Sequence, residues 1–417
     1  MQYGPDAAMD RTQAAAETVG ADMRGAVATT RGLVLDVVRM RRAISRVELA
    51  EITGLTQATI STTVRSLLED GLLSESGARE FTGGKPRVML ELNPRSRCAV
   101  GVALGADWIV ITVVDAAGSI VARTRVRGAR EEAPTAVVAR IAAHVDGLLV
   151  ASGLPSEALI GLGLAAPGVV NIEAGTILES RSMSHWHDFQ IREALAQATG
   201  LDVVIDNNAA AAAIGEFWGG GIGAATAHCT IFMGASIGAG IVLNGSVYRG
   251  ASGNAGAVGP LRLGGAAGWN PLATVEEQAG PRAVAARVRA AIARGRTTVI
   301  DLPESAENPF ADFAAVATAA IHGDPLGVSL IEESAEYLVD AVLLLANVLD
   351  LDSVVLAGPS FSIAGSIYQD VVSRRLAADF YAKARHGVTV RLSAQISDAA
   401  AIGSAALVLQ RELAPRS

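Results

Sequence analysis

The sequence predicts an α/β protein that carries a small, mostly helical domain ahead of a larger body of strands and helices. Three observations lead to this prediction. Helical periodicity near Thr30 precedes two short capped helices, the pattern changes to strands after Gly71, and from Cys98 onward strands alternate with longer helices. With 417 residues, 50% of them hydrophobic, the chain can bury a large core and form two or more domains.

Composition excludes several classes of protein. No apolar stretch free of charge approaches the roughly 20 residues that a membrane span needs, and the N-terminus lacks the basic and apolar segments of a secretory signal. Cys98 and Cys229 are far apart and are expected to be unpaired thiols. We therefore expect a cytoplasmic protein without a membrane partner. Residues 1–27 are polar and alanine-rich without steady periodicity, and are expected to form a flexible tail.

The charge is distributed unevenly along the chain. The net charge is -8, but residues 24–97 carry twelve Lys and Arg against eight Asp and Glu, a net of +4. Residues 1–23 carry -3, which leaves -9 on residues 98–417. A basic segment joined to a larger acidic one is typical of a DNA-contacting module attached to a domain that avoids phosphates.

The basic segment contains three predicted helices. The first has apolar residues at helical spacing beside a basic run, Arg39, Arg41 and Arg42. The second begins at Ser45, because Ser45 and Glu48 have the spacing of a capping box. Gly54 ends that helix and Thr56 caps the third. Two short helices joined by a glycine-containing turn form a helix-turn-helix, whose second helix enters a major groove of DNA.

The third helix is expected to divide into an apolar and a polar face. Its apolar stripe is predicted to be Ala58, Ile60, Val64, Leu67 and Leu68. The polar residues left to meet DNA are Gln57, Thr59, Ser61, Thr62 and Arg65. Strands on both sides of residues 83–87 predict a wing with Lys85 and Arg87 at its tip. Residues 28–97 are thus predicted to be a winged helix-turn-helix; the alternative is a helical hairpin with a solvated polar face.

Residues 98–417 show a strand and helix plan that occurs twice. Three consecutive strands and a long helix open the first half, and a strand hairpin followed by helices opens the second. This repetition predicts the actin-like, sugar-kinase architecture, which clamps ligands between two lobes. We expect lobe one to comprise about 98–209 with the segment 393–417, and lobe two about 210–392.

Two glycine-rich segments in this order, after a winged helix, carry a family resemblance. Residues 161–170, Gly-Leu-Gly-Leu-Ala-Ala-Pro-Gly-Val-Val, and residues 232–245, from Phe232 to Gly245, resemble the strand into the sugar pocket and the second phosphate loop of the ROK family. This family is named for repressors, open reading frames and kinases. The resemblance covers nearly everything from Thr30 onward.

The chain departs from the family pattern where kinases carry their chemistry. The Asp that organises metal and phosphates aligns with Ala103, and Asp107 with Trp108 stands where backbone approaches the γ-phosphate, so negative charge there is expected to repel ATP. The Asp that deprotonates the sugar hydroxyl aligns with Asn208, and an amide cannot act as a general base near pH 7. The resemblance therefore implies that this chain is not an enzyme and has no catalytic residue.

The family's zinc loop is also altered. The zinc-binding His aligns with Pro260, and residues 264–269 contain none of the expected cysteines, so we predict neither a metal ion nor any other cofactor. Ala257 replaces a carboxylate that would bind sugar hydroxyls. The resemblance retains Asn207 and Glu276 as ligand-binding residues, and Asn208, at the altered position, is the third candidate. Residues 186–188 are similar to the family's Trp-containing lid.

Three hypotheses follow from these residues. The first is a transcriptional regulator, expected to be a repressor, that binds operator DNA as a homodimer or homotetramer and senses a sugar or sugar-derived effector. The second is an ATP-dependent kinase for a hexose or N-acetylhexosamine, for which Asp206 is the nearest candidate base. The third is a regulator whose ROK domain only oligomerises and binds no ligand.

Overall fold

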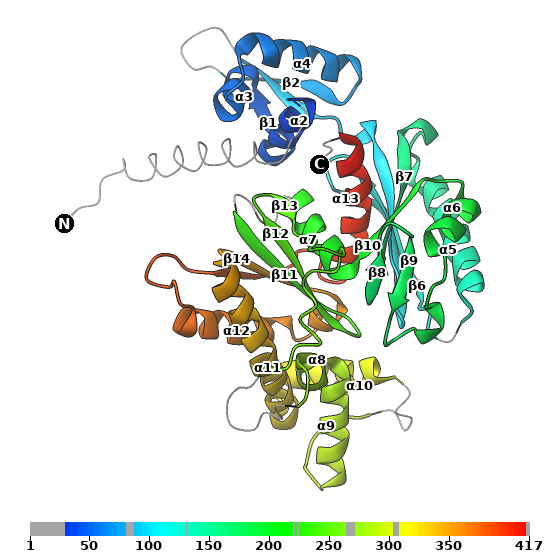
Figure 1. The fold of residues 1–417 in the computed structure, drawn as a ribbon, viewed down its shortest axis with the longest axis vertical. Coiled ribbons are helices and arrows are strands. Elements are labelled where there is room, and N and C mark those ends of the chain that lie inside the picture. The colour runs from blue at the N-terminus through cyan, green and yellow to red at the C-terminus, as the bar shows by residue number, and fades with distance from the viewer. Residues whose placement is uncertain are drawn as a thin grey trace, which may run out of the picture.

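The structure is a computed structural model, and it describes residues 30–80, 87–130, 132–219, 222, 225–263, 272–302 and 308–413. Figure 1 shows three parts: a small N-terminal domain at the top and two lobes below it, each built around a sheet. The α/β architecture with an N-terminal winged helix-turn-helix that the sequence predicts is confirmed. The predicted tail at residues 1–27 lies outside the described residues.

The N-terminal domain packs three helices against a three-stranded sheet. The sheet order is β1-β3-β2, with both pairings antiparallel. Ser45 and Glu48 form the predicted capping box, and Gly54 ends the second helix in the left-handed conformation, with φ 68°. The sequence analysis missed the first, very short strand. The elements are α2 Thr30–Arg41, β1 Ala43–Ser45, α3 Arg46–Thr53, α4 Gln57–Glu69, β2 Leu73–Glu80 and β3 Arg87–Leu92.

The first lobe is built on a five-stranded sheet with the order β10-β7-β4-β5-β6. The three consecutive strands β4, β5 and β6 form antiparallel pairs, whereas β7 joins β4 and β10 joins β7 in parallel. The elements are β4 Cys98–Ala103, β5 Trp108–Asp115, β6 Ile120–Arg127, α5 Pro134–Ser152, β7 Leu159–Ala166, β8 Val169–Asn171, β9 Thr176–Glu179, α6 Ile191–Thr199 and β10 Val203–Asn207.

The second lobe repeats this plan with the sheet order β13-β12-β11-β14-β15. Here too an antiparallel hairpin, β11 and β12, is followed by two strands that add in parallel, β14 and then β15. The elements are β11 Ala227–Met233, β12 Ile237–Leu243, β13 Ser246–Val247, α8 Val275–Ala279, α9 Pro281–Ala293, α10 Pro309–Ile321, α11 Pro325–Leu349, β14 Ser353–Ala357, α12 Gly365–Asp379 and β15 Thr389–Leu392.

Two helices, α7 Asn208–Trp218 and α13 Ala399–Leu413, lie between the two sheets. Both are rich in small residues, so their backbones approach closely. A Cβ atom at Gly403 would lie 1.6 Å from the carbonyl oxygen of Ala211, so only glycine fits at this crossing. The two lobes are therefore joined through a helix pair whose contact tolerates no added side chain at this point.

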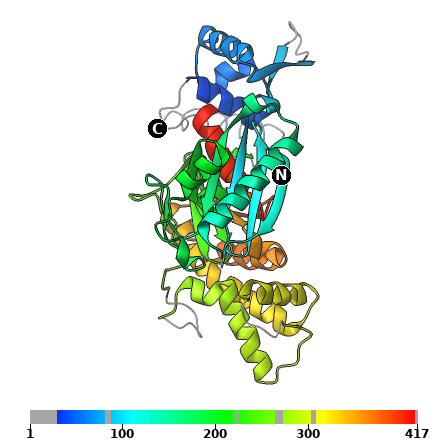
Figure 2. The ribbon, with the colours of Figure 1, turned by 90° about the vertical axis from the view of Figure 1, so that its right-hand side faces the viewer.

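The N-terminal domain shares a hydrophobic core with these two helices. One cluster of buried side chains runs from Val34 and Val38 of α2 through Ile214 and Trp218 of α7 to Ala405 and other residues of α13. Figures 1 and 2 both place the domain at the end of α13 and remote from α9. The N-terminal domain is thus packed onto the body of the protein through apolar side chains rather than tethered by a linker.

One helix in the described ranges, α5, is long and apolar enough to cross a membrane, and α10 with α11 would pass the same test as a bent pair. In the fold, α5 packs its apolar face on β5 and β6. Core helices of soluble proteins meet the same criteria, so this finding is weak evidence for a span.

Candidate functional site

The exposed face of α4 is the first candidate site. Gln57, Ser61, Thr62 and Arg65 are exposed, whereas Thr59 is half-buried and its hydroxyl lies 2.9 Å from that of Thr56. The buried stripe consists of Ile60, Val64 and Leu67. The structure corrects one expectation: Ala58, predicted to face the core, is exposed, because it lies nearly opposite Ile60 around the helix. Lys85 and the side chain of Arg87 lie outside the described residues.

Three other arginines of this domain, Arg31, Arg39 and Arg46, contact acidic partners. Arg31 pairs with Asp70 at 2.6 Å, and Arg46 pairs with Glu75 at 3.0 Å, both on the surface. Within the described part of the domain, Arg65 is the cation on the outward face of α4. It is therefore the described side chain of that helix best placed to meet a phosphate or a base edge.

Arg39, in the basic run at the end of the first helix, connects the N-terminal domain to α7. It is buried, and its guanidinium donates hydrogen bonds to the carbonyl oxygens of Phe217 and Trp218, the last residues of α7. The same group lies over the aromatic ring of Trp218 and 3.3 Å from the buried carboxylate of Asp36. Arg39 therefore ties α2 to the C-terminal end of α7, where the helix dipole favours a cation.

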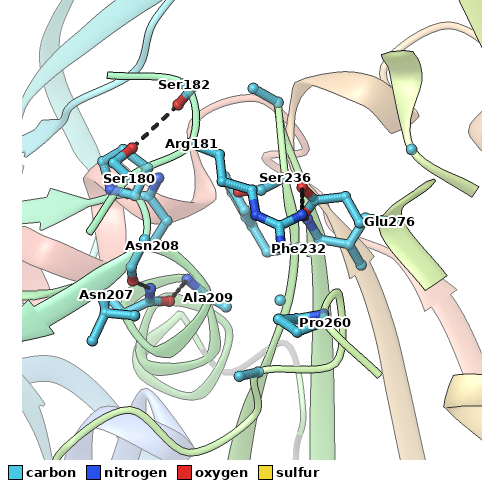
Figure 3. A pocket seen from close by; sticks show the side chains of 18 of the residues that line it. Ser180, Arg181, Ser182, Asn207, Asn208, Ala209, Phe232, Ser236, Pro260 and Glu276 are labelled. Carbon is cyan, nitrogen blue, oxygen red and sulfur yellow. Dashed lines mark hydrogen bonds and ion pairs between the residues drawn. The ribbon is translucent and has the colours of Figure 1, made fainter. Parts of the chain in front are cut away.

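The second candidate site is a cavity of about 660 Å³ between the lobes. Its lining brings together all three predicted ligand residues, Asn207, Asn208 and Glu276, although Glu276 is distant from the two asparagines in the sequence. Figure 3 shows Asn207 and Asn208 on one side, with Arg181 and Glu276 lying near each other on the other. Such a volume suits a small molecule.

The two asparagines have different environments. Asn207 caps α7 by accepting a hydrogen bond from the backbone of Ala209 at 2.8 Å, and its amide donates to the carbonyl oxygen of Gly168. Its polar atoms are therefore engaged in holding the loop that follows β7. The Oδ1 atom of Asn208 is buried and, within the described part of the chain, has no hydrogen-bond partner. A buried acceptor in this state is costly unless a ligand or water satisfies it.

Glu276 lies in the first turn of α8 and faces the cavity rather than solvent. Its Oε2 accepts a hydrogen bond from the backbone of Ile237 at 3.0 Å, and its Oε1 lies 3.8 Å from Arg181. Burial raises the pKa of Glu276, and these two contacts oppose the shift. The sequence analysis did not identify Arg181, because no motif marks an arginine in the loop after β9.

Asp206, the alternative catalytic base, does not line this cavity. It is fully buried, with one oxygen 2.5 Å from the Arg249 guanidinium and the other accepting from the backbone of Asn207. Both carboxylate oxygens are therefore occupied by protein groups. A base needs a lone pair within reach of the hydroxyl proton that it abstracts, and Asp206 is buried outside the lining of this cavity.

The region where kinases place their phosphates is a smaller cavity of about 80 Å³, lined by Ala103, Trp108, Phe232 and Phe310 among others. The expectation about Asp107 needs correction. Its carboxylate forms an ion pair with Arg130 and is largely buried, so it does not present unbalanced negative charge. What this region lacks for a nucleotide is instead a carboxylate at the position of Ala103.

The residues that the structure describes do not form a metal site, because no three or more His, Cys, Asp or Glu side chains lie together among them. Pro260 lines the larger cavity. Residues 264–271, where the family's zinc loop would lie, are outside the described ranges. Trp186 is buried, and His187 forms an exposed ion pair with Asp188, so the expected lid segment contributes a packed indole.

Comparison with known proteins agrees with this geometry. The "Putative xylose repressor" of Caldicellulosiruptor sp. (strain Rt8B.4) is 26% identical over 385 residues, 92% of this chain and 96% of that protein. A glucokinase of Halalkalibacterium halodurans is 29% identical over 325 residues, 76% of this chain and 96% of the enzyme. The kinase thus matches about three quarters of the chain, whereas the repressor matches almost throughout.

A solved structure shows the same fold. The crystal structure of a ROK family transcriptional regulator, a homologue of the E. coli MLC protein, has a TM-score of 0.68 at 22% identity and covers 91% of this chain and 95% of its own. The family model for ROK matches residues 99–411. The chain therefore belongs to the ROK family, in the branch of transcriptional regulators that carry a winged helix-turn-helix.

Proposed function

We propose that this protein is a repressor that binds operator DNA through α4 and the wing. The observation that carries the proposal is the outward face of α4, where small polar residues and Arg65 are exposed on a helix held firmly by its buried stripe. A helix with this face at its N-terminal half fits a major groove. Lys85 and Arg87 extend the contact to the adjacent minor groove.

The cavity between the lobes serves as the sensor site, and its ligand is a sugar or a sugar derivative. Asn208 offers a buried acceptor without a partner in the described structure, and Ser180, Ser182 and Ser236 add hydroxyl groups to the lining. A polyhydroxy compound has donors and acceptors to match such a surface. Glu276 and Arg181 provide a paired carboxylate and guanidinium for further hydroxyls.

Helix α7 connects the sensor site to the DNA-binding domain. Asn207 and Asn208 lie at its first turn in the cavity, and the carbonyl groups of Phe217 and Trp218 at its last turn bind Arg39. The helix spans 11 residues, about 16 Å. A ligand that displaces the first turn therefore acts on the same rigid element that holds α2, which supplies the coupling between two sites that allostery requires.

The ROK domain of this chain does not catalyse phosphoryl transfer. Asn208 replaces the base, Asp206 is engaged by Arg249, and Ala103 stands where family kinases carry the carboxylate that organises metal and phosphates. The kinase hypothesis is the weaker one for these reasons. The hypothesis of a ligand-independent platform is disfavoured by the larger cavity and by the unpartnered Asn208 oxygen.

We propose to divide the chain at about residue 97. Lobe one then comprises residues 98–209 with 393–417, and lobe two comprises residues 210–392. Operators read by helix-turn-helix proteins are palindromic, so the active form is a homodimer or homotetramer. Access to the chromosome places the protein in the cytoplasm.

The test uses the full-length protein and DNA selected from a random pool. Binding of the selected site is then titrated with sugars, sugar phosphates and nucleotides, and wild type is compared with Asn208→Ala. We expect one sugar class to change the operator Kd at least tenfold in wild type but not in the variant. Failure to select any site would contradict the regulator, and operator binding that no ligand alters would favour the platform.

A further inference from the structure

The outward face of α4 has an alanine at its N-terminal end. Ala58, Thr62, Arg65 and Glu69 follow one another at intervals of four, three and four residues, so they form one stripe along the helix, opposite Ile60 and Val64. All four are exposed. Ala58 is the second residue of the helix after its cap, Thr56, and so it lies in the turn that reaches base edges when a recognition helix enters the groove.

The side chain of Ala58 is a methyl group, so it can make only apolar contacts. A methyl group cannot donate or accept a hydrogen bond, but it can pack on another methyl group, and in the major groove that group is the C5-methyl of thymine. A small side chain also lets the helix axis approach the bases closely. Ala58 contributes nothing to the core, since it is exposed beside Gln57 and Ser61 on the open side of the helix.

We propose that Ala58 is a specificity-determining residue that reads a thymine methyl group in the operator. The inference rests on the proposed DNA-binding function and adds one base preference to it. The competing explanation is that alanine is present only because it favours helix formation. That explanation predicts no chemical dependence on the DNA base, so the two are separable by changing the DNA rather than the helix.

The experiment replaces each thymine of the selected operator, one at a time, by deoxyuridine, which lacks only the methyl group. Operator Kd is measured for wild type, Ala58→Gly, Thr62→Ser and Thr63→Ser. Thr62→Ser and Thr63→Ser each remove one methyl group, Thr62 from the same stripe and Thr63 from the half-buried flank of α4. Far-UV circular dichroism and melting of each variant establish that it is folded.

One thymine in each half-site should then show a loss of about fourfold in wild-type affinity on replacement, the ratio expected for one buried methyl group. The loss should vanish in Ala58→Gly and persist in both serine variants. If Ala58→Gly binds too weakly to measure, Ala58→Ser takes its place. This variant should change the loss of affinity caused by replacing that one thymine and leave the effects of the other replacements as they are in wild type.

Two results would overturn the inference while leaving DNA binding intact. One is an operator in which no thymine replacement changes wild-type affinity. The other is a sensitive thymine whose effect survives in Ala58→Gly or disappears only in Thr62→Ser, which would assign the reading to Thr62. Absence of any selected operator would instead refute the proposed function itself.

Discussion

The guanidinium carbon of Arg39 lies 4.3 Å from the centre of the Trp218 indole ring, so a side chain of the DNA-binding domain is stacked on the last residue of a helix that begins in the sensor cavity. A guanidinium over an indole face in a buried setting is a favourable contact. The neighbouring Asp36 carboxylate, 2% exposed, forms an ion pair with the same guanidinium.

Replacing Arg39 by Met is therefore expected to lower the free energy of unfolding by about 3 kcal/mol or more, because the buried Asp36 carboxylate loses its cation. The matched control is Arg31→Met on the same helix, whose ion pair with Asp70 is exposed and should contribute about 1 kcal/mol or less. Urea denaturation at pH 7 measures both. Equal losses in the two variants would show that Arg39 has no special role at the domain contact.

Substitutions on the DNA face should reduce affinity without affecting the fold. Arg65→Ala should flatten the slope of log Kd against log salt by about one unit if it contacts a phosphate, and the Lys85→Ala, Arg87→Ala pair by about two. A base-edge contact of Arg65 would instead cost roughly 1 to 3 kcal/mol and relax specificity. The control is Arg374→Ala on α12, which removes the same charge from the second lobe. If the slope of log Kd against log salt in these DNA-face variants equals that of wild type, the DNA contact lies elsewhere on the protein.

The purified protein should not release ADP from ATP in the presence of any hexose or N-acetylhexosamine. Asn208→Asp should remain inactive, because a restored base still lacks a positioned and neutralised γ-phosphate. Coupled ADP-release assays across a sugar panel measure this. Sugar-dependent turnover in wild type that is lost in Asn208→Ala would establish a kinase, and loss in Asp206→Ala would show that the motif is displaced by two residues.

Zinc should be absent from protein purified without chelator, because Pro260 and residues 264–269 offer none of the family's ligands. Elemental analysis is the measurement. One zinc per chain would contradict the prediction and direct attention to His185, His187, His228 and Cys229.

Acid stability should depend on His228, which is fully buried between the hydroxyl groups of Ser353 and Thr230. Burial lowers the pKa of His228 from 6.5 to about 3. The unfolded chain therefore binds one more proton between these values, so the free energy of unfolding falls as the pH drops from about 6.5 to about 3. His228→Gln should reduce this slope, whereas His322→Gln at the surface should leave it unchanged. Identical pH profiles for all three proteins would contradict the assignment.

The elements that local sequence determines were predictable. The capping box of Ser45 and Glu48 and the left-handed Gly54 involve residues within a few positions of one another, so the two short helices followed from the sequence. Asn207, Asn208 and Glu276 could be named as candidate ligand residues from family motifs alone, because each motif has a fixed place in the fold. Their meeting around one cavity is a product of the tertiary structure.

The errors arose where tertiary contacts decide the outcome. Asp107 looked like an open negative charge because its partner, Arg130, is 23 residues away. The contacts of Arg39 could not be foreseen from its basic run, because they are at residues 217 and 218. Ala58 was placed in the core by hydrophobicity, although the helix phase set by Ile60 and Val64 turns it outward. The helical phase of the residues in α4 could have been worked out from the sequence, and this would have corrected only the last of these errors.

The crossing of α7 and α13 also sets an order of assembly. Helix α13 supplies Ala405, Leu409 and other apolar side chains to the core on which α2 packs, yet it is the last described element to be synthesised. During translation the N-terminal domain emerges first but lacks that surface until α13 has left the ribosome. A growing chain therefore cannot fix its recognition helix, α4, in place on the body of the protein. Control of the operator begins only after synthesis has passed α13.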